Sequence, residues 1–194
     1  MMMNRLLIGL TLVAITTGIN VYNNQDNYSG KTEFERYGFS FLYPGNMMIL
    51  ESGFPDFGSG ASDFSGCFQG TIVIGERIEQ IQVVWKVVQE YDTLEEALIS
   101  LYEDVTNDST ITINYLSEID AYENIEFTYK FLYFEADQEG LSFNAIIGIT
   151  IIPWESLRSN RGYCIIYLAT EGVYNESELK STYIRFLSSF KPAN

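Results

Sequence analysis

The sequence predicts an α+β domain in which an antiparallel β-sheet is flanked by helices. Several segments alternate apolar and polar residues with a period of two, as strands of a half-buried antiparallel sheet do. Two further segments repeat apolar residues every three to four positions, as amphipathic helices do. The 194-residue chain is 46% apolar and 15% aromatic, which is enough for the core of one domain of ordinary size.

Residues 1–21 have the pattern of a secretory signal peptide. Arg5 precedes an apolar run at residues 6–15, and small residues follow the run. A membrane-spanning helix needs about 20 apolar residues, which is more than this run offers. We therefore expect a signal that is cleaved, with an uncleaved signal anchor as the alternative. Residues 22–33 are polar and are expected to form a linker to a domain at residues 34–192.

Export would place the protein outside the cell or on its surface, where two kinds of modification become available. Three Asn-x-Ser triplets, beginning at Asn27, Asn107 and Asn175, match the N-glycosylation acceptor pattern. Asn107 and Asn175 also lie at predicted helix ends, so a structural role is the alternative. The cysteines, Cys67 and Cys164, are either joined in a disulfide or are two buried thiols.

The first strand is predicted at residues 37–44, Tyr-Gly-Phe-Ser-Phe-Leu-Tyr-Pro. Phe39, Phe41 and Tyr43 fall on one side of an extended strand, and a proline ends it. This aromatic side requires a partner surface. A short second strand is predicted at residues 47–50.

Residues 51–70 combine five glycines with four phenylalanines, which is unusual for a surface loop. Two interpretations are open. The segment either folds back onto the sheet, which its apolar content favours, or presents a contact surface to a partner. The candidate binding residues in it are Phe54, Asp56, Phe57, Asp63 and Phe64.

Further strands are predicted at residues 70–75, 79–88, 110–115, 125–133, 143–151 and 163–170, with a turn at residues 137–140. In the second of these, Ile81, Val83 and Trp85 line one face, and Gln80 and Gln82 lie on a face that is expected to be partly wet.

Two helices complete the prediction. The first begins near Asp92, where Thr93 and Glu96 have the spacing of a capping box, and the second begins near Asn175. The apolar stripe of the first helix is Leu94, Ala97, Leu98, Leu101 and Val105, and that of the second is Leu179, Tyr183, Phe186, Leu187 and Phe190.

The order of these elements and three local patterns resemble the Mog1/PsbP-like fold. The patterns are residues 37–44, the Arg-Gly-Tyr at residues 161–163, and the Phe-Leu-Ser-Ser-Phe-Lys-Pro at residues 186–192. The resemblance implies an α-β-α sandwich in a family of mostly non-enzymatic accessory or binding proteins. It includes photosystem subunits, a branch that binds a small GTPase, and exported prokaryotic proteins. No functional residue carries over, and the chain has no histidine to match those proposed to bind metal in photosynthetic members.

The composition excludes several functions. With 26 acidic against 11 basic residues, the net charge of −15 would repel nucleic acid. With no histidine, a serine or cysteine nucleophile would lack its usual base, and no cofactor motif or metal-ligand set is present. We expect an exported, non-enzymatic domain that binds a protein or envelope partner. The alternative is a Ca²⁺- or Mn²⁺-binding domain that uses Glu118, Asp120 and Glu123, and a carboxylate-based hydrolase is a remote one.

Overall fold

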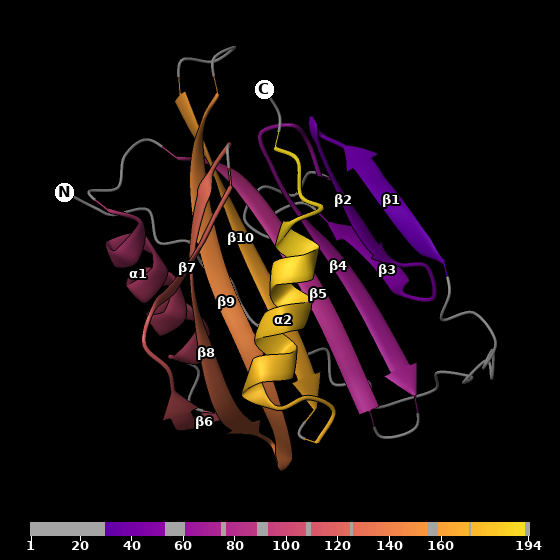
Figure 1. Cartoon of the computed structure of the whole chain (residues 1–194), viewed down its shortest axis with the longest axis vertical. Helices are drawn as coiled ribbons and strands as arrows, with labels where there is room; N and C mark the ends of the chain where they lie inside the picture. The colour runs from indigo at the N-terminus through magenta and orange to yellow at the C-terminus, as the bar shows by residue number, and fades with distance from the viewer. Residues whose placement is uncertain are drawn as a thin grey trace.

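An eight-stranded antiparallel sheet forms the middle of the structure, with helices on both faces, as the sequence predicts for an α+β domain (Figure 1). The structure is a computed structural model. It describes residues 30–52, 61–74, 77–88, 93–107, 110–124, 126–154, 159–170 and 172–192. Within these segments, no helix is both long enough and apolar enough to span a membrane.

The strands of the sheet lie in the order β3 (Met48–Ser52), β4 (Ser65–Ile74), β5 (Arg77–Val88), β10 (Ser159–Thr170), β9 (Leu141–Trp154), β8 (Thr128–Gln138) and β6 (Ile111–Leu116). The short strand β7 (Asp120–Glu123) also pairs with β8, beyond the end of β6. β3 therefore forms one outer edge of the sheet, and β6 with β7 forms the other. A separate hairpin consists of β1 (Lys31–Arg36) and β2 (Phe39–Pro44).

Helix α1 (Leu94–Thr106) packs on one face of the sheet, over β8 and β9. The Thr93 side chain accepts a hydrogen bond from the Glu96 amide at 3.1 Å, so the predicted helix start is confirmed. The buried residues of α1 are Ala97, Leu98, Leu101 and Val105. They belong to a core cluster that includes Leu132, Phe134, Phe143, Ile147 and Ile166 of the sheet.

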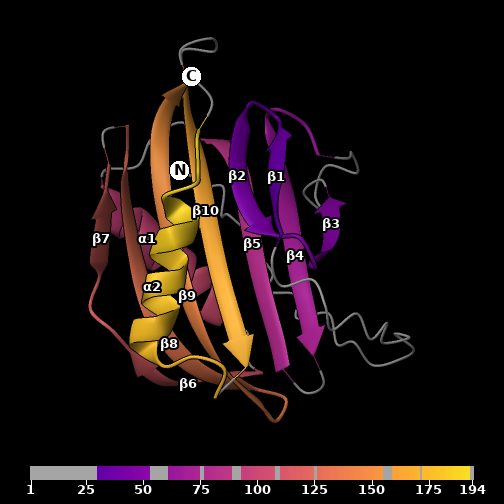
Figure 2. The same cartoon turned by 45° about the vertical axis from the view of Figure 1, so that its right-hand side comes forward.

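Helix α2 (Glu176–Leu187) covers β8 and β9 from the opposite face (Figure 2). Asn175 and Glu178 form a complete capping box at its start. The ring of Tyr183 lies 5.4 Å from that of Phe131 on β8. Tyr183 reaches this depth because Gly148 of β9 has no side chain: a Cβ there would overlap the Tyr183 hydroxyl.

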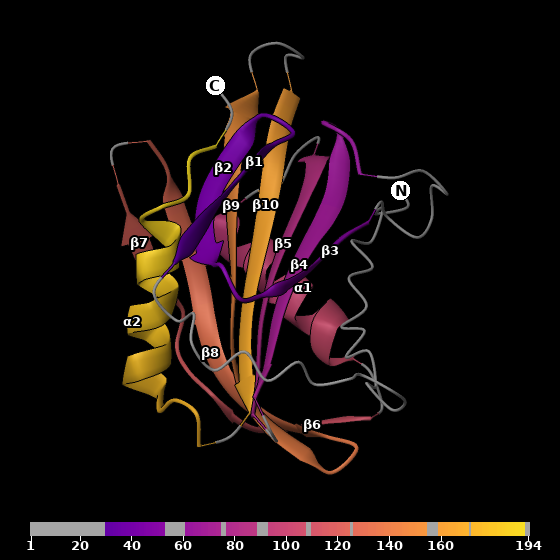
Figure 3. The same ribbon diagram turned by 90° about the vertical axis from the view of Figure 1, so that its right-hand side faces the viewer.

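The β1–β2 hairpin covers the rest of this face, as Figure 3 shows with α2 and α1 on opposite sides of the sheet. Phe41 lies 4.9 Å from Phe68 of β4, measured between ring centroids. Phe39 lies 5.0 Å from Trp85 of β5 and 5.3 Å from Tyr163 of β10. The predicted aromatic side of residues 37–44 is thus confirmed, and its partner surface is the sheet.

The segment that follows α2 fixes the hairpin in place. Ser40 and Lys191 exchange backbone hydrogen bonds of 2.9 and 2.8 Å, and the amide of Leu42 donates to the Ser189 hydroxyl at 3.1 Å. Phe190, which was predicted to lie on the helix stripe, follows the helix instead and packs 5.0 Å from the Tyr163 ring. The last turn ends before it because the chain must leave the helix to reach the hairpin.

The start of the domain differs from the prediction. β1 begins at Lys31, so the last three residues of the predicted linker belong to a strand. Five of its six residues are exposed, and only Phe34 is buried. A strand with one buried side chain has no apolar alternation, which explains why the sequence pattern missed it.

Other boundaries also move. β4 begins at Ser65, inside the predicted 51–70 loop, and β10 begins at Ser159 rather than near residue 163. β7 was not predicted. Glycines and polar residues at these strand ends masked the period-two pattern. The predicted 137–140 turn is confirmed, with positive φ at Glu139 (52°) and Gly140 (85°).

The face of β5 that was expected to be partly wet is buried. Gln80 and Gln82 are only 6% and 4% exposed, and Gln80 donates a hydrogen bond of 3.4 Å to Thr71 of β4. Gln82 in turn donates to the Gln80 side-chain oxygen at 3.5 Å, and these hydrogen bonds allow both amides to be buried.

We expect removal of the Tyr129 hydroxyl to stabilise the domain. Tyr129 is fully buried, and its hydroxyl has no hydrogen-bond partner within the described segments, whereas the Tyr183 hydroxyl donates to the Ile165 carbonyl at 3.0 Å. Tyr129→Phe should raise the free energy of unfolding in urea by about 1 kcal/mol, and the control Tyr183→Phe should lower it by about the same amount. Equal losses in both variants would contradict this expectation.

Candidate interaction surface

The structure describes two of the five predicted binding residues, Asp63 and Phe64, just before β4. Phe54, Asp56 and Phe57 lie outside the described residues. Phe64 is 55% exposed. Phe68, in the same glycine-rich stretch, is completely buried in the aromatic core. At its described end the stretch therefore contributes Phe68 to the core and leaves Phe64 on the surface, and a contact with a partner stays a prediction.

Hydrogen bonds between residues close in sequence hold the backbone of the segment that carries Phe64. The amide of Ser62 donates to the Ser65 carbonyl at 3.0 Å, and the amide of Phe64 donates to the Ser62 hydroxyl at 3.3 Å. The Phe64 carbonyl accepts from the Val87 amide at 3.0 Å, which joins the segment to β5. The buried Trp85 donates from its indole nitrogen to the Ser62 carbonyl at 2.8 Å.

The buried side chain of Arg161, on β10, holds this segment through a hydrogen bond to its backbone. It is 1% exposed, and its guanidinium donates to the carbonyls of Asp63 and Tyr37, the latter at 2.7 Å. The guanidinium carbon also lies 5.7 Å from the Phe39 ring centroid and 5.6 Å from that of Tyr163. Carbonyl dipoles and aromatic faces stabilise a buried cation, and a planar guanidinium can address both at once.

The turn of the β1–β2 hairpin contacts the same two residues, Arg161 and Trp85. Tyr37 and Gly38 have φ angles of 54° and 74°, as a two-residue hairpin turn with two left-handed positions requires. The Tyr37 ring stacks on Trp85 at 5.0 Å, and its hydroxyl donates to Glu51 of β3 at 3.1 Å. Burial, followed by the bond to Glu51, raises the pKa of Tyr37. Arg161 thus joins two loops that are 26 residues apart in sequence, at Tyr37 and Asp63.

Gly66 keeps the segment close to the sheet. A Cβ at this position would overlap the Trp85 ring. Together these contacts present an exposed phenyl ring on a segment whose backbone is held at Ser62, Asp63 and Phe64. Such an arrangement offers apolar contact area and no reactive group.

Sequence reasoning identified Asp63 and Phe64 but missed Arg161 and Trp85 as their supports. Arg161 was noted only as part of the Arg-Gly-Tyr pattern. The available signal was an arginine two residues before the aromatic Tyr163 and the apolar run that follows it, because an arginine next to a buried strand is itself buried only when paired.

The two cysteines are free thiols in this structure, so the disulfide alternative is wrong here. Cys67 on β4 and Cys164 on β10 both lie opposite Val84, on the strand between them. Two strand spacings of about 4.8 Å separate their backbones, beyond the about 7 Å that a disulfide allows.

Asn107 and Asn175 are exposed and occupy the helix ends that the sequence predicted. Asn107 is the residue at the C-terminus of α1, and its amide donates to the Glu103 carbonyl at 2.9 Å. The Asn175 side chain accepts from the Glu178 amide at 3.0 Å. Asn27 lies outside the described residues. Glycosylation of the three stays a prediction.

The acidic residues of the proposed cation site do not converge. The described residues contain no group of three or more His, Cys, Asp or Glu side chains that could hold a metal ion. Asp120 instead binds Lys180 of α2 at 2.6 Å, which leaves Glu118 and Glu123 exposed on either side. Desolvation lowers the pKa of Lys180, but hydrogen bonds to Asp120 and Glu176 outweigh it and raise the pKa overall.

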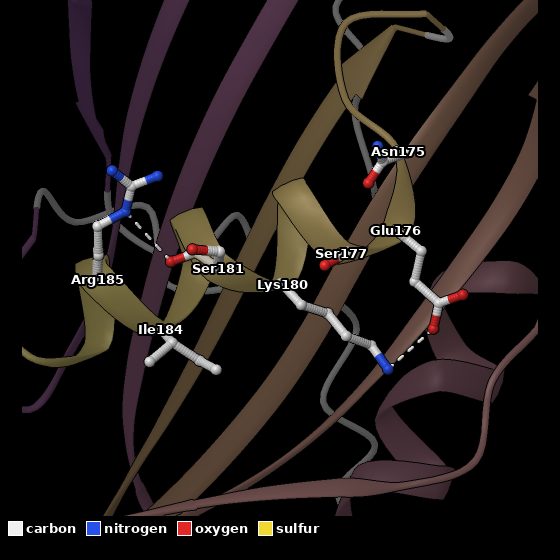
Figure 4. Close-up of a pocket in the computed structure, with 7 residues that line it drawn as sticks. All are labelled: Asn175, Glu176, Ser177, Lys180, Ser181, Ile184 and Arg185. Atoms are coloured by element: carbon white, nitrogen blue, oxygen red, sulfur yellow. Dashed lines mark hydrogen bonds and ion pairs between the residues drawn. The ribbon is translucent and has the colours of Figure 1, made fainter.

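An open depression of about 670 Å³ lies along the outer surface of α2 (Figure 4). Its lining residues are Asn175, Glu176, Ser177, Lys180, Ser181, Ile184 and Arg185. Lys180 is paired with Glu176 at 2.9 Å, and Arg185 donates to the Ser181 carbonyl at 3.4 Å. The polar groups are thus engaged within the helix, and none of them converges on a common point.

Comparison with solved structures gives neighbours that include two structures of Mog1. No protein-family model matches the chain, and no curated protein matches it. A substituted form of the protein Mog1 aligns at 14% identity over 85% of this chain and 97% of its own, with a TM-score of 0.45. The Ran-binding protein Mog1p of Saccharomyces cerevisiae aligns at 14% identity over 84% and 95%, with a TM-score of 0.44.

We expect both thiols to resist alkylation in the native protein. Burial raises the pKa of Cys67 to about 11 and also raises that of Cys164. Because only the thiolate reacts, iodoacetamide at pH 8 should label neither cysteine quickly, and the rate for Cys67 should rise about tenfold per pH unit up to its pKa. Denatured, non-reduced protein should take up two labels by mass spectrometry. A mass without label after denaturation would show a disulfide.

Proposed function

We propose that the chain is a non-enzymatic, exported binding domain that recognises a protein partner with the surface around Phe64. The observation that carries this proposal is the exposed Phe64 ring on a segment held from the sheet side. Trp85 binds the carbonyl of Ser62, and Arg161 binds that of Asp63. Phe64 as a whole residue is 55% exposed to solvent.

Rigid support matters because binding costs conformational freedom. A loop that is already ordered loses less entropy when a partner docks on it. Binding residues are commonly found on loops that a rigid scaffold positions. Aromatic side chains are over-represented among the residues that dominate interface energies, because they bury a large area with few rotatable bonds. Phe64 meets both conditions.

The charge of the chain indicates the chemistry of the partner. Asp63 precedes Phe64, and the net charge of −15 makes the overall surface strongly negative. We expect the partner to offer an apolar pocket for the phenyl ring, bordered by lysine or arginine. Complementary charge speeds the encounter and excludes acidic competitors.

Phe64 should be needed for binding but not for folding. Phe64→Ala should leave the free energy of unfolding within about 0.5 kcal/mol of the wild type, because the side chain is mostly exposed. Phe68→Ala, four residues later, should cost about 3–5 kcal/mol, because that ring is 0% exposed in the core. Urea unfolding measures both.

A photo-reactive phenylalanine analogue at position 64 of the full chain tests the binding role. In envelope extract of the source organism it should cross-link one protein, and an excess of unlabelled wild-type chain should prevent this cross-link while the same excess of the Phe64→Ala variant should not. The matched control carries the analogue at Ile99, which is 46% exposed on α1. Equal cross-linking from both positions would contradict the proposal.

Export is tested by the mass of the protein that producing cells release. The pattern of residues 1–21 predicts a mature chain that begins near residue 22. Intact mass spectrometry of the released fraction should therefore lack these residues. A full-length mass in the membrane fraction would support the uncleaved anchor, and a full-length mass in the cytosol would contradict export.

A further inference from the structure

One outer strand of the sheet carries no charge. β6 has the sequence Ile-Thr-Ile-Asn-Tyr-Leu, and the uncharged run extends over residues 109–117 of a chain with net charge −15. β6 pairs with β8 on one side only, so within the described part of the chain its outer backbone groups have no neighbouring strand. Isoleucine, threonine and tyrosine favour extended structure. Open edges of this kind pair readily with another strand.

The other outer strands are protected by charge. Four of the six residues of β1 are charged, in the sequence Lys-Thr-Glu-Phe-Glu-Arg. β7 has Asp120 and Glu123 among its four residues. β3 is five residues long and contains Glu51, which pairs with Arg36 at 2.9 Å. Charged side chains on an edge oppose strand addition. β3 also exposes Met48 and Ile49, but it is short and carries a charge. β2 is uncharged, but on the side away from β1 it pairs at Ser40 with Lys191. Within the described residues, β6 is therefore the uncharged edge that no other segment covers.

Two adjacent apolar side chains on β6 are exposed. Tyr115 is 45% exposed and Leu116 is 44% exposed. The pairing register shifts between Ile113 and Tyr115, which turns Tyr115 to the α2 side, 6.0 Å from Tyr133. Leu116 lies opposite Phe134, on the α1 side. Apolar surface is therefore open on both sides of this edge, and an added strand would cover it.

Two carboxylates of β8 lie opposite β6, and both accept hydrogen bonds within the chain: Glu135, opposite Tyr115, accepts from the Tyr133 hydroxyl at 2.8 Å. Asp137 lies opposite Thr112, and its two oxygens accept hydrogen bonds from Asn114 at 2.8 Å and Ser142 at 2.5 Å. Ile111 and Ile113 pack partly against the core on the α1 side, and the exposed residues of β6 are Thr112, Asn114, Tyr115 and Leu116, all uncharged. A positively charged partner strand would have no negative side chain on β6 to pair with.

We propose that β6 pairs with β6 of a second copy of the chain, antiparallel about a two-fold axis. Two copies with net charge −15 repel each other over most of their surface, and an uncharged strand lets them meet without opposing carboxylates. A two-fold interface must be complementary to itself. An uncharged strand meets this condition in any register. At β1, the central two-fold registers would instead place Glu33 opposite Glu35, or Lys31 opposite Arg36.

Sedimentation velocity of the full chain over a range of concentrations tests this inference. The wild type should be a dimer at high concentration that dissociates on dilution. Raising the salt concentration should strengthen the dimer, because it screens the repulsion between the copies. Thr112 is exposed on β6, and Thr112→Lys should weaken dimerisation about tenfold or more, because each copy would bring a charge to the shared edge.

The matched control is Thr32→Lys, on the exposed outer strand β1, which should dimerise like the wild type. Thermal unfolding must show that both variants fold. Hydrogen exchange should slow at the β6 amides as protein concentration rises. A monomeric wild type, or association that Thr112→Lys leaves unchanged, would overturn the inference. If the wild type is monomeric and its β6 amides exchange quickly at every concentration, self-pairing is ruled out, and only a strand from a different protein could pair with this edge.

Discussion

The fold depends on the aromatic layer between the β1–β2 hairpin and the sheet. Helix α2 covers mainly the part of the face formed by β8 and β9. β4, β5 and β10 would otherwise expose Phe68, Trp85 and Tyr163 to solvent, and the hairpin covers them with Phe39 and Phe41. Buried aromatic rings of this size contribute several kcal/mol each to stability. A hairpin has little stability by itself, so the two parts need each other.

The same layer positions the candidate interaction surface. The Tyr37 turn stacks on Trp85, and the segment before β4 hydrogen bonds to the indole of the same residue. Arg161 lies under both and binds a carbonyl of each. The packing of the hairpin and the exposure of Phe64 therefore depend on the same residues. Trp85 stacks on the hairpin turn and also binds the backbone next to Phe64.

The acidic composition acts on the surface rather than on the fold. Acidic side chains that pair within the chain, such as Asp120 and Glu176 with Lys180, fasten α2 to β7 or stabilise the helix. The remaining acids keep the surface negative. Phe64 and β6 are uncharged parts of this surface. Electrostatic repulsion opposes contact with other acidic molecules least at such places.

Local patterns predicted most of the elements. Thr93 and Asn175 start helices in both sequence and structure because capping depends on residues within one turn. Phe39 and Phe41, or Ile81 and Val83, share a face because side chains alternate along any strand. Strand ends were predicted less accurately wherever a strand lacked apolar alternation, and β1 was missed altogether for this reason.

The sequence by itself determined the α+β class, the helix caps, the alternation of the strands and the acidic charge, since each depends on neighbours along the chain. Only the tertiary structure decided that Phe68 is core and Phe64 surface, that Val84 separates Cys67 from Cys164, and that Arg161 is buried. These outcomes depend on which strands lie side by side. Residues as far apart as Tyr37, Asp63 and Arg161 meet only after the whole sheet has formed.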